Sequence, residues 1–161
     1  MKIYVNDPAV PYKNTTVNAQ RSKMEIDAVL ALWGIKDSGW RWSPEDGEVF
    51  VTFQLREVID GREVAPVIKI YCPTLWNKGS RRKREEVNWN VSMRVMYWYI
   101  KSHLEMAHLM QSSKTVEFLP HIQTRMLSGE TVSLKDRLVE VNILDALPEK
   151  KMNERIIDIT P

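Results

Sequence analysis

The sequence predicts an α+β fold, ordered as a helix, a three-stranded antiparallel sheet, a long central helix and a C-terminal helix. Three observations support this fold class. Apolar residues with helical spacing precede Gly34, and three stretches between residues 39 and 72 show the alternation typical of strands. A long Trp- and Met-rich segment near residues 84–111 follows with helical spacing. At 43% hydrophobic and 27% charged residues, the composition is that of an ordinary globular domain.

The chain of 161 residues is long enough to form one domain with a substantial core. We expect residues 1–15 to form an extended N-terminal arm, because Pro8 and Pro11 disfavour a helix. Residues 16–148 are expected to form a single α+β domain, and residues 149–161 a charged C-terminal tail.

The first helix is predicted over residues 17–33. The polar residues 14–16 offer capping hydroxyls, and Gly34 supplies the left-handed position that often follows a helix. The apolar stripe of this helix is expected to contain Met24, Ala28, Ala31 and Ile35.

The three strands are predicted at residues 39–42, 49–55 and 64–72. Residues 44–47 form a strong turn signal, and Asp60-Gly61 is the best short hairpin signal in the chain. Alternation along the second strand places Phe50 opposite its Val residues, and along the third it groups Lys69 with Tyr71. Pro66 indicates an edge strand or a late strand start.

Helix, three strands, helix is also the order of double-stranded-RNA-binding domains. The likeness is one of topology alone. The Lys-rich start of the second helix in those domains would have to be residues 81–84 here, and the surrounding residues do not match.

The long helix has only one narrow polar sector, formed by Arg94, Lys101, Glu105 and His108. Nearly all its other residues are apolar or small, so it must be buried on several sides. One interpretation is a central core helix; the other is a Met- and aromatic-rich interface with a second subunit or another protein. A short helical segment is expected at residues 115–122, and the last helix from Ser133 to about residue 147.

The charge balance excludes a protein that coats nucleic acid by charge alone, because the net charge is only +2. The single cysteine, Cys72, indicates a reducing compartment and is expected to be a buried structural thiol. The sequence shows no signal peptide and no apolar run long enough to span a membrane. We therefore expect a cytoplasmic protein with no membrane partner.

A basic cluster precedes the long helix, and it is the first candidate site: Lys78, Arg81, Arg82, Lys83 and Arg84. Cations at a helix start oppose the helix dipole, and a bound phosphate would relieve that cost. The alternative is that the helix starts later, with Glu85 and Glu86 in its first turn and the basic residues in a solvated loop.

The second candidate site is the pair Trp40 and Trp42, which flank Arg41 on the first strand. If exposed, the two rings would form a stacking platform for bases. If buried, they belong to the core, which is the favoured interpretation in a chain with six Trp residues.

Catalytic and metal-binding signals are weak. Glu105 and His108 have a spacing found in di-iron bundles, but the chain has only three His residues and no second copy of the motif. No nucleophile elbow, phosphate loop or paired-carboxylate motif is present. We expect no metal, no cofactor and no enzymatic activity.

Two stretches, residues 100–122 and 129–132, resemble a family of small uncharacterised proteins encoded by phages and prophages. The resemblance covers roughly residues 20–138 and implies a phage or mobile-element setting without any activity that can be transferred. The expected function is a non-catalytic accessory protein that contacts nucleic-acid phosphates through residues 78–84, with Arg41, Trp40 and Trp42 secondary. The alternative is a structural protein that assembles through its long helix, with itself or with another protein.

Overall fold

The computed structural model describes residues 2–59, 61–79, 84–125 and 130–134. Its helices are α1 (Ala19–Leu32), α2 (Trp89–Leu109), α3 (Lys114–Glu117) and a 3-10 turn at Leu119–His121. The strands before α2 are β1 (Ile3–Tyr4), β2 (Ser38–Ser43), β3 (Glu48–Gln54), β4 (Glu57–Ile59), β5 (Arg62–Val64), β6 (Val67–Tyr71), β7 (Leu75–Asn77) and β8 (Glu86–Val87). After the helices come β9 (Gln123–Arg125) and β10 (Thr131–Ser133).

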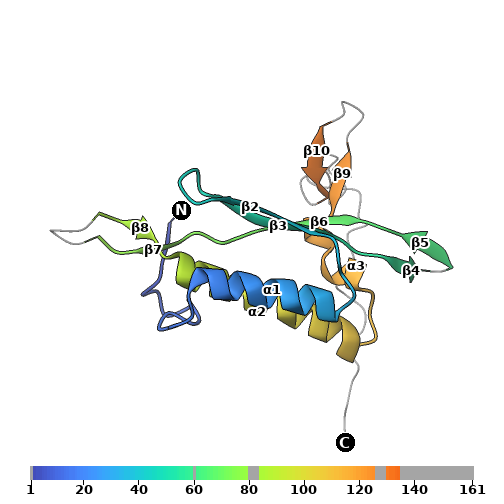
Figure 1. The fold of residues 1–161 in the computed structure, drawn as a ribbon, viewed down its shortest axis with the longest axis horizontal. Coiled ribbons are helices and arrows are strands. Elements are labelled where there is room, and N and C mark those ends of the chain that lie inside the picture. The colour runs from blue at the N-terminus through green and yellow to red at the C-terminus, as the bar shows by residue number, and fades with distance from the viewer. Residues whose placement is uncertain (1, 60, 80–83, 126–129, 135–161) are drawn as a thin grey trace, which may run out of the picture.

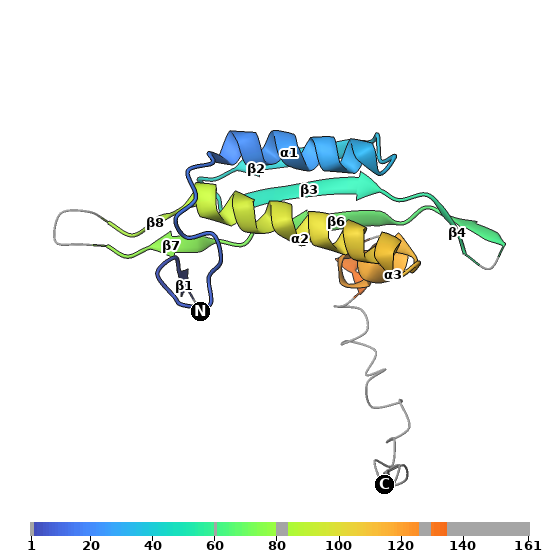
Figure 2. The ribbon, with the colours of Figure 1, turned by 90° about the horizontal axis from the view of Figure 1, so that it is seen from below.

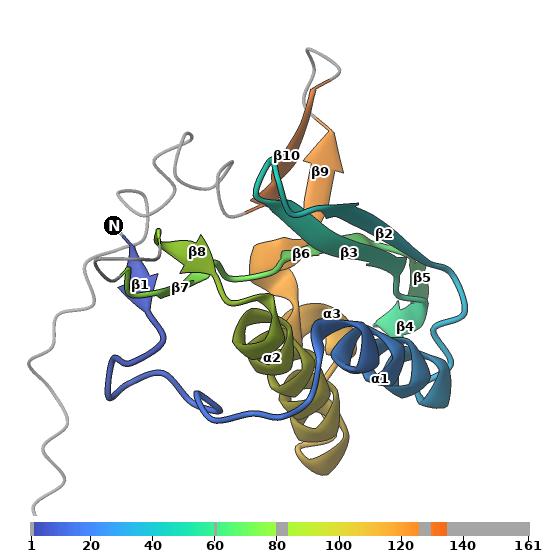
Figure 3. The ribbon, with the colours of Figure 1, turned by 60° about the vertical axis from the view of Figure 1, so that its left-hand side comes forward.

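The main sheet is antiparallel with the strand order β2-β3-β6. Helices α1 and α2 lie side by side against one of its faces, and β9 and β10 project on the other side (Figures 1 and 3). The α+β class and the three-stranded sheet are as predicted, but the described residues also form three smaller sheets, β1-β7-β8, β4-β5 and β9-β10. The predicted start of the last helix at Ser133 is wrong, because Ser133 ends strand β10; the rest of that helix beyond residue 134 and the charged tail lie outside the described residues.

One predicted turn connects β2 and β3 of this sheet, and the other connects β4 and β5 of a smaller sheet. Gly47 has φ +71° in the turn that pairs Ser43 with Glu48, and Gly61 has φ +75° in the turn that pairs Ile59 with Arg62. Both values lie in the left-handed region that glycine adopts without strain. Strand β6 starts directly after Pro66, as expected for a residue that cannot donate to the ladder.

Helix α1 begins and ends on clear signals. Asn18 is its N-cap and accepts a hydrogen bond from the Arg21 amide at 2.7 Å, so the predicted cap at residues 14–16 is wrong. At the other end Gly34 has φ +78°, and the Ile35 amide donates back to the Leu30 carbonyl, which confirms the predicted termination.

The predicted apolar stripe of α1 is wrong within the helix, although Ile35 just after it is buried. The buried face contains Ser22, Ile26 and Leu30, whereas Met24 and both predicted Ala residues are exposed. Ser22 interrupts the apolar spacing on the buried face of α1, so the apolar pattern predicted the wrong face.

Helix α2 begins at Trp89, not near residue 84. Residues 86–87 pair with β7 as strand β8, and the Asn88 side chain then accepts the Val91 amide at 3.1 Å as the N-cap. The buried residues of α2 form one long face of the helix: Val91, Ser92, Met93, Met96, Ile100, Leu104 and Ala107.

Several elements surround α2. The sheet covers one side and α1 another (Figure 2). Arg94 of α2 forms an ion pair with Glu25 of α1. The N-terminal segment covers a third side, where Tyr12 stacks on Trp98 with ring centroids 5.7 Å apart. Along most of its length α2 is therefore a central core helix, the first of the two interpretations made from the sequence.

Candidate nucleic-acid interface

The basic cluster does not lie at a helix start. Lys78 and Arg84 are exposed in the connection between β7 and β8, and Arg81, Arg82 and Lys83 lie outside the described residues. The first turn of α2, residues 89–92, contains neither Lys nor Arg. The helix-dipole argument for a phosphate at these residues is therefore lost, and only their local charge supports it.

The alternative placement of Glu85 and Glu86 in the first helical turn is also wrong. Glu85 instead accepts hydrogen bonds from Lys2 Nζ at 2.7 Å and from Tyr4 Oη at 2.8 Å. The hydrogen bond from Lys2 is the main reason that the pKa of Glu85 lies below its ordinary value. The N-terminal segment thus holds one side of the β7–β8 connection.

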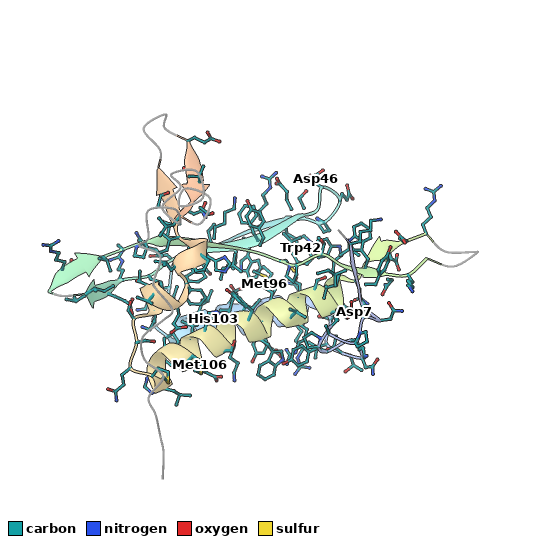
Figure 4. The ribbon with its side chains drawn as sticks, turned by 180° about the vertical axis from the view of Figure 1, so that it is seen from behind. Asp7, Trp42, Asp46, Met96, His103 and Met106 are labelled. Carbon is teal, nitrogen blue, oxygen red and sulfur yellow. The ribbon has the colours of Figure 1, made fainter. Side chains whose placement is uncertain are left out.

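Trp40 and Trp42 share one face of β2, as predicted, but this is the face that meets the helices. The Trp40 Nε1 donates to Asp27 Oδ1 at 2.8 Å, and its ring packs against the core. The Trp42 ring lies 6.0 Å from that of Trp89 and remains 42% exposed at the edge of the core (Figure 4). Neither ring lies on the outer face of the sheet.

Arg41 points the opposite way from the two Trp residues and so lies on the outer face of the sheet. The register places it directly across from Phe50, and Phe50 across from Tyr71. The two rings are 5.2 Å apart at an interplanar angle of 60°, and Tyr71 is 57% exposed. This row therefore presents two neighbouring aromatic rings on a surface that helices do not cover.

A cation lies over these rings. The Lys69 Nζ is 4.1 Å from the Phe50 ring centroid and 4.7 Å from that of Tyr71. Lys69 occupies the next register row, across from Thr52. Its charge is within the range of a cation–π contact with both rings.

An ion pair borders the rings on the side of the β2–β3 turn. Arg41 Nε and Glu48 Oε2 are 2.6 Å apart, and both side chains are about half exposed, at 56% and 50%. We call the five residues Arg41, Glu48, Phe50, Lys69 and Tyr71 the sheet platform.

A shallow, open hollow of about 490 Å³ continues the platform toward β4. The outer-face residues Gly39, Thr52, Gln54 and Val67 contribute to its lining. A Cβ atom added at Gly39 would lie 3.1 Å from Thr52 Oγ1, so the absence of a side chain there keeps the hollow open. The outer face thus offers aromatic rings followed by a polar depression.

Sequence reasoning missed Phe50, Lys69 and Tyr71 as site residues. The alternation had already grouped Phe50 with one side of its strand, and Lys69 with Tyr71 on one side of theirs. The signal that joins the two groups is the β3–β6 register, which pairs Phe50 with Tyr71.

A second group of aromatic and polar side chains joins α2 to the segment after α3. Tyr99 Oη and His121 Nε2 are 2.7 Å apart, and the His103 Nδ1–H donates to the Tyr99 carbonyl at 2.9 Å. Burial raises the pKa of Tyr99, so its phenol stays protonated at neutral pH. The ring of fully buried Phe118 stacks on His103, which indicates a packing role for this group.

The remaining candidates for chemistry are held in structural contacts. Cys72 is buried, and burial raises the pKa of its thiol to about 12. Glu105 pairs with Lys101, and no group of three or more His, Cys, Asp or Glu residues in the described part of the chain is placed to hold a metal ion. None of the helices in the described ranges is long and apolar enough to cross a membrane.

No known family, no curated protein and no solved structure matches the chain.

Proposed function

We propose that this chain is a non-catalytic protein that binds single-stranded nucleic acid on the sheet platform. The observation that carries the proposal is the Phe50–Tyr71 ring pair with Lys69 over it, in which Tyr71 is exposed and Phe50 half-buried. Bases of a single strand stack on such rings, while a nearby cation binds the backbone. The setting that we propose with it is a phage or mobile element acting in the host cytoplasm.

Two features favour a single strand over a duplex. Bases reach aromatic side chains only when they are unstacked, as in single strands and loops. The described residues also lack the charges that a duplex would need at the corresponding elements, since the start of α2 has no cation and the β2–β3 turn contains Glu45 and Asp46. The element order that the chain has in common with double-stranded-RNA-binding domains therefore does not extend to a duplex ligand in this proposal.

The basic connection between β7 and β8 is proposed as an auxiliary phosphate contact. Lys78 and Arg84 are exposed there, and Arg81, Arg82 and Lys83 lie between them in the sequence. Each phosphate neutralised on a single strand contributes about −0.7 to the slope of log affinity against log salt. Changing Arg81, Arg82 and Lys83 together to Ala should therefore make the slope shallower without abolishing binding.

The test is fluorescence anisotropy with labelled single- and double-stranded oligonucleotides at low salt. Tyr71→Ala should weaken single-strand binding about five- to 150-fold, because stacking contributes about 1–3 kcal/mol per base. Val116→Ala, which truncates a side chain 58% exposed on α3, is the control and should bind as the wild type does.

Three results would contradict the platform proposal: no binding to any strand, equal binding by Tyr71→Ala and the wild type, or loss of binding only in the basic triple variant. The last of these would instead favour the β7–β8 connection as the main site.

A second candidate function follows from a separate observation. Apolar side chains are exposed at the C-terminal ends of the two long helices, with Leu32 82%, Leu109 72% and Met110 67% exposed. These ends are close together, since the Trp33 and His108 rings are 5.4 Å apart. We propose self-assembly through this surface as the alternative function. Light scattering that shows a monomer at tens of micromolar would exclude it.

A further inference from the structure

We infer that the Arg41–Glu48 pair makes the sheet platform selective for guanine. The inference rests on the proposed binding of single strands and specifies which base the platform prefers. It starts from a feature that phosphate binding alone does not explain, namely a half-exposed carboxylate beside the rings. A carboxylate on such a surface repels phosphate, so its presence calls for a role in contacting a base edge.

The ion pair presents hydrogen-bonding groups in a fixed order. A guanidinium only donates and a carboxylate only accepts. Arg41 Nε lies 2.6 Å from Glu48 Oε2, which keeps a second lone pair, so within the described structure the Arg41 Nη groups and both carboxylate oxygens can still meet a ligand. Side by side, the two groups offer a donor followed by two acceptors.

Guanine is the base whose Watson–Crick edge complements this order. Its O6 accepts, and its N1–H and N2–H₂ groups donate, so O6 meets Arg41 and the two donors meet the Glu48 carboxylate. Adenine and cytosine place ring-nitrogen acceptors against the carboxylate and are disfavoured. Uracil and thymine match at two of the three positions, because their second carbonyl replaces the donor N2–H₂.

The register places this pair where the edge of a stacked base would reach it. Arg41 lies directly across from Phe50, at a typical Cβ separation of about 5 Å for paired strands. Glu48 lies two residues before Phe50 on the same face of β3, about 7 Å along the strand. A base that takes the place of the Lys69 ammonium over Phe50 therefore has the ion pair along one edge, and the displaced Lys69 in the next row can reach the sugar–phosphate side.

The experiment compares short uracil oligonucleotides that contain one central guanine, adenine, cytosine or hypoxanthine, and the matching thymine-based DNA strands. A single guanine avoids four-stranded assemblies. For the wild-type protein we expect the guanine strand to bind at least about tenfold more tightly than the adenine strand, with hypoxanthine intermediate because it lacks N2–H₂.

Glu48→Gln replaces one acceptor by a donor and should abolish the preference for guanine, while binding of the all-uracil strand is retained or strengthened. Glu63→Gln, an exposed carboxylate on β5, is the matched control and should keep the preference. Arg41→Ala should also reduce it. Thermal melts of each variant check that the fold is intact.

The outcomes separate the two proposals. Equal binding of guanine and adenine strands that still depends on Tyr71 would overturn the guanine inference and leave the proposed function standing. A guanine preference that survives in Glu48→Gln would also overturn the inference. No binding of any strand would overturn both.

Discussion

Glu57 lies on β4 and its carboxylate caps the start of α3. Its Oε2 accepts from Ser113 Oγ at 2.8 Å, from the Thr115 amide at 2.8 Å and from Thr115 Oγ1 at 2.7 Å, and its Oε1 accepts from the Lys114 amide at 2.9 Å. One side chain thus fixes the segment after α2 to the end of the β3–β4 extension. We predict that Glu57→Ala destabilises the protein by about 2 kcal/mol.

The size of this destabilisation follows from the hydrogen bonds that lose their acceptor in Glu57→Ala. Hydrogen bonds to a charged acceptor contribute about 1.5–3 kcal/mol each when buried, but the four here share one carboxylate and are not additive. The site is only partly buried, so water replaces part of the loss. We therefore expect a loss in the free energy of unfolding comparable to that on removal of a strong N-cap, at the upper end of the range of about 0.5–2 kcal/mol.

The contribution of Glu57 to the stability of the fold should be larger at neutral pH than in acid. Burial acts to raise the pKa of the carboxyl, but the hydrogen bonds from Thr115, Ser113 and Lys114 outweigh it, and the pKa lies below the ordinary value of 4.5. The folded state then binds this proton more weakly than the unfolded state does. The stabilisation is full above about pH 4.5 and is lost as the pH falls through the folded-state pKa.

Urea unfolding at pH 7 and at about pH 3 provides the assay. The stability difference between the wild type and Glu57→Gln should be large at neutral pH and should shrink in acid, because the amide mimics the protonated acid. Glu63→Gln on the exposed face of β5 should change stability little at either pH. A Glu57→Gln difference that is equal at both pH values, or below about 0.5 kcal/mol at pH 7, would refute the capping argument.

Three further predictions concern the core and a turn. Ile100→Ala removes a fully buried side chain and should cost about 2–5 kcal/mol in urea unfolding, whereas Leu109→Ala, at 72% exposure, should cost less than about 0.5 kcal/mol. Gly34→Ala should cost about 1 kcal/mol from the left-handed φ of +78° alone, because nothing lies within 4 Å of an added Cβ; a neutral change would contradict this. The Cys72 thiol, with a pKa of about 12, should react with Ellman's reagent at pH 8 only after unfolding, and fast reaction of the folded protein would contradict its burial.

Local signals in the sequence predicted the parts of the fold that depend on local geometry. Gly34 ends α1, and Gly47 and Gly61 occupy their turns with positive φ. These positions need a backbone conformation that glycine adopts at little cost, so the residue type alone carries the information. The order of the first helix, the three main strands and the long helix followed from the same kind of evidence.

The start of α2 could not be predicted in the same way. Residues 84–88 have no local feature that prevents a helix, and what removes them from it is the pairing of Glu86 and Val87 with β7. The inner face of α1 depended likewise on where α2 packs, which makes Ser22 an inner residue. Long-range contacts override local propensity in both cases.

The candidate site combines both kinds of information. Alternation correctly separated Trp40 and Trp42 from Arg41, and Phe50 from its Val neighbours. Alternation does not indicate which face the helices cover, although the six Trp residues of the chain favoured a core position for the Trp pair. Once α1 and α2 cover the Trp face, Arg41, Phe50 and Tyr71 are left on the outer face by geometry.

The charge balance of the chain bears directly on how such a face would bind. The platform has two cations, Arg41 and Lys69, and one of them is already paired with Glu48. A surface with so little free charge gains little affinity from counterion release, so most of its binding energy has to come from stacking and hydrogen bonds. Stacking and hydrogen bonding act on the base and not on the phosphate, and base contacts are the ones that discriminate sequence. The low net charge, which excludes non-specific coating of nucleic acid, is therefore consistent with a face that selects a base.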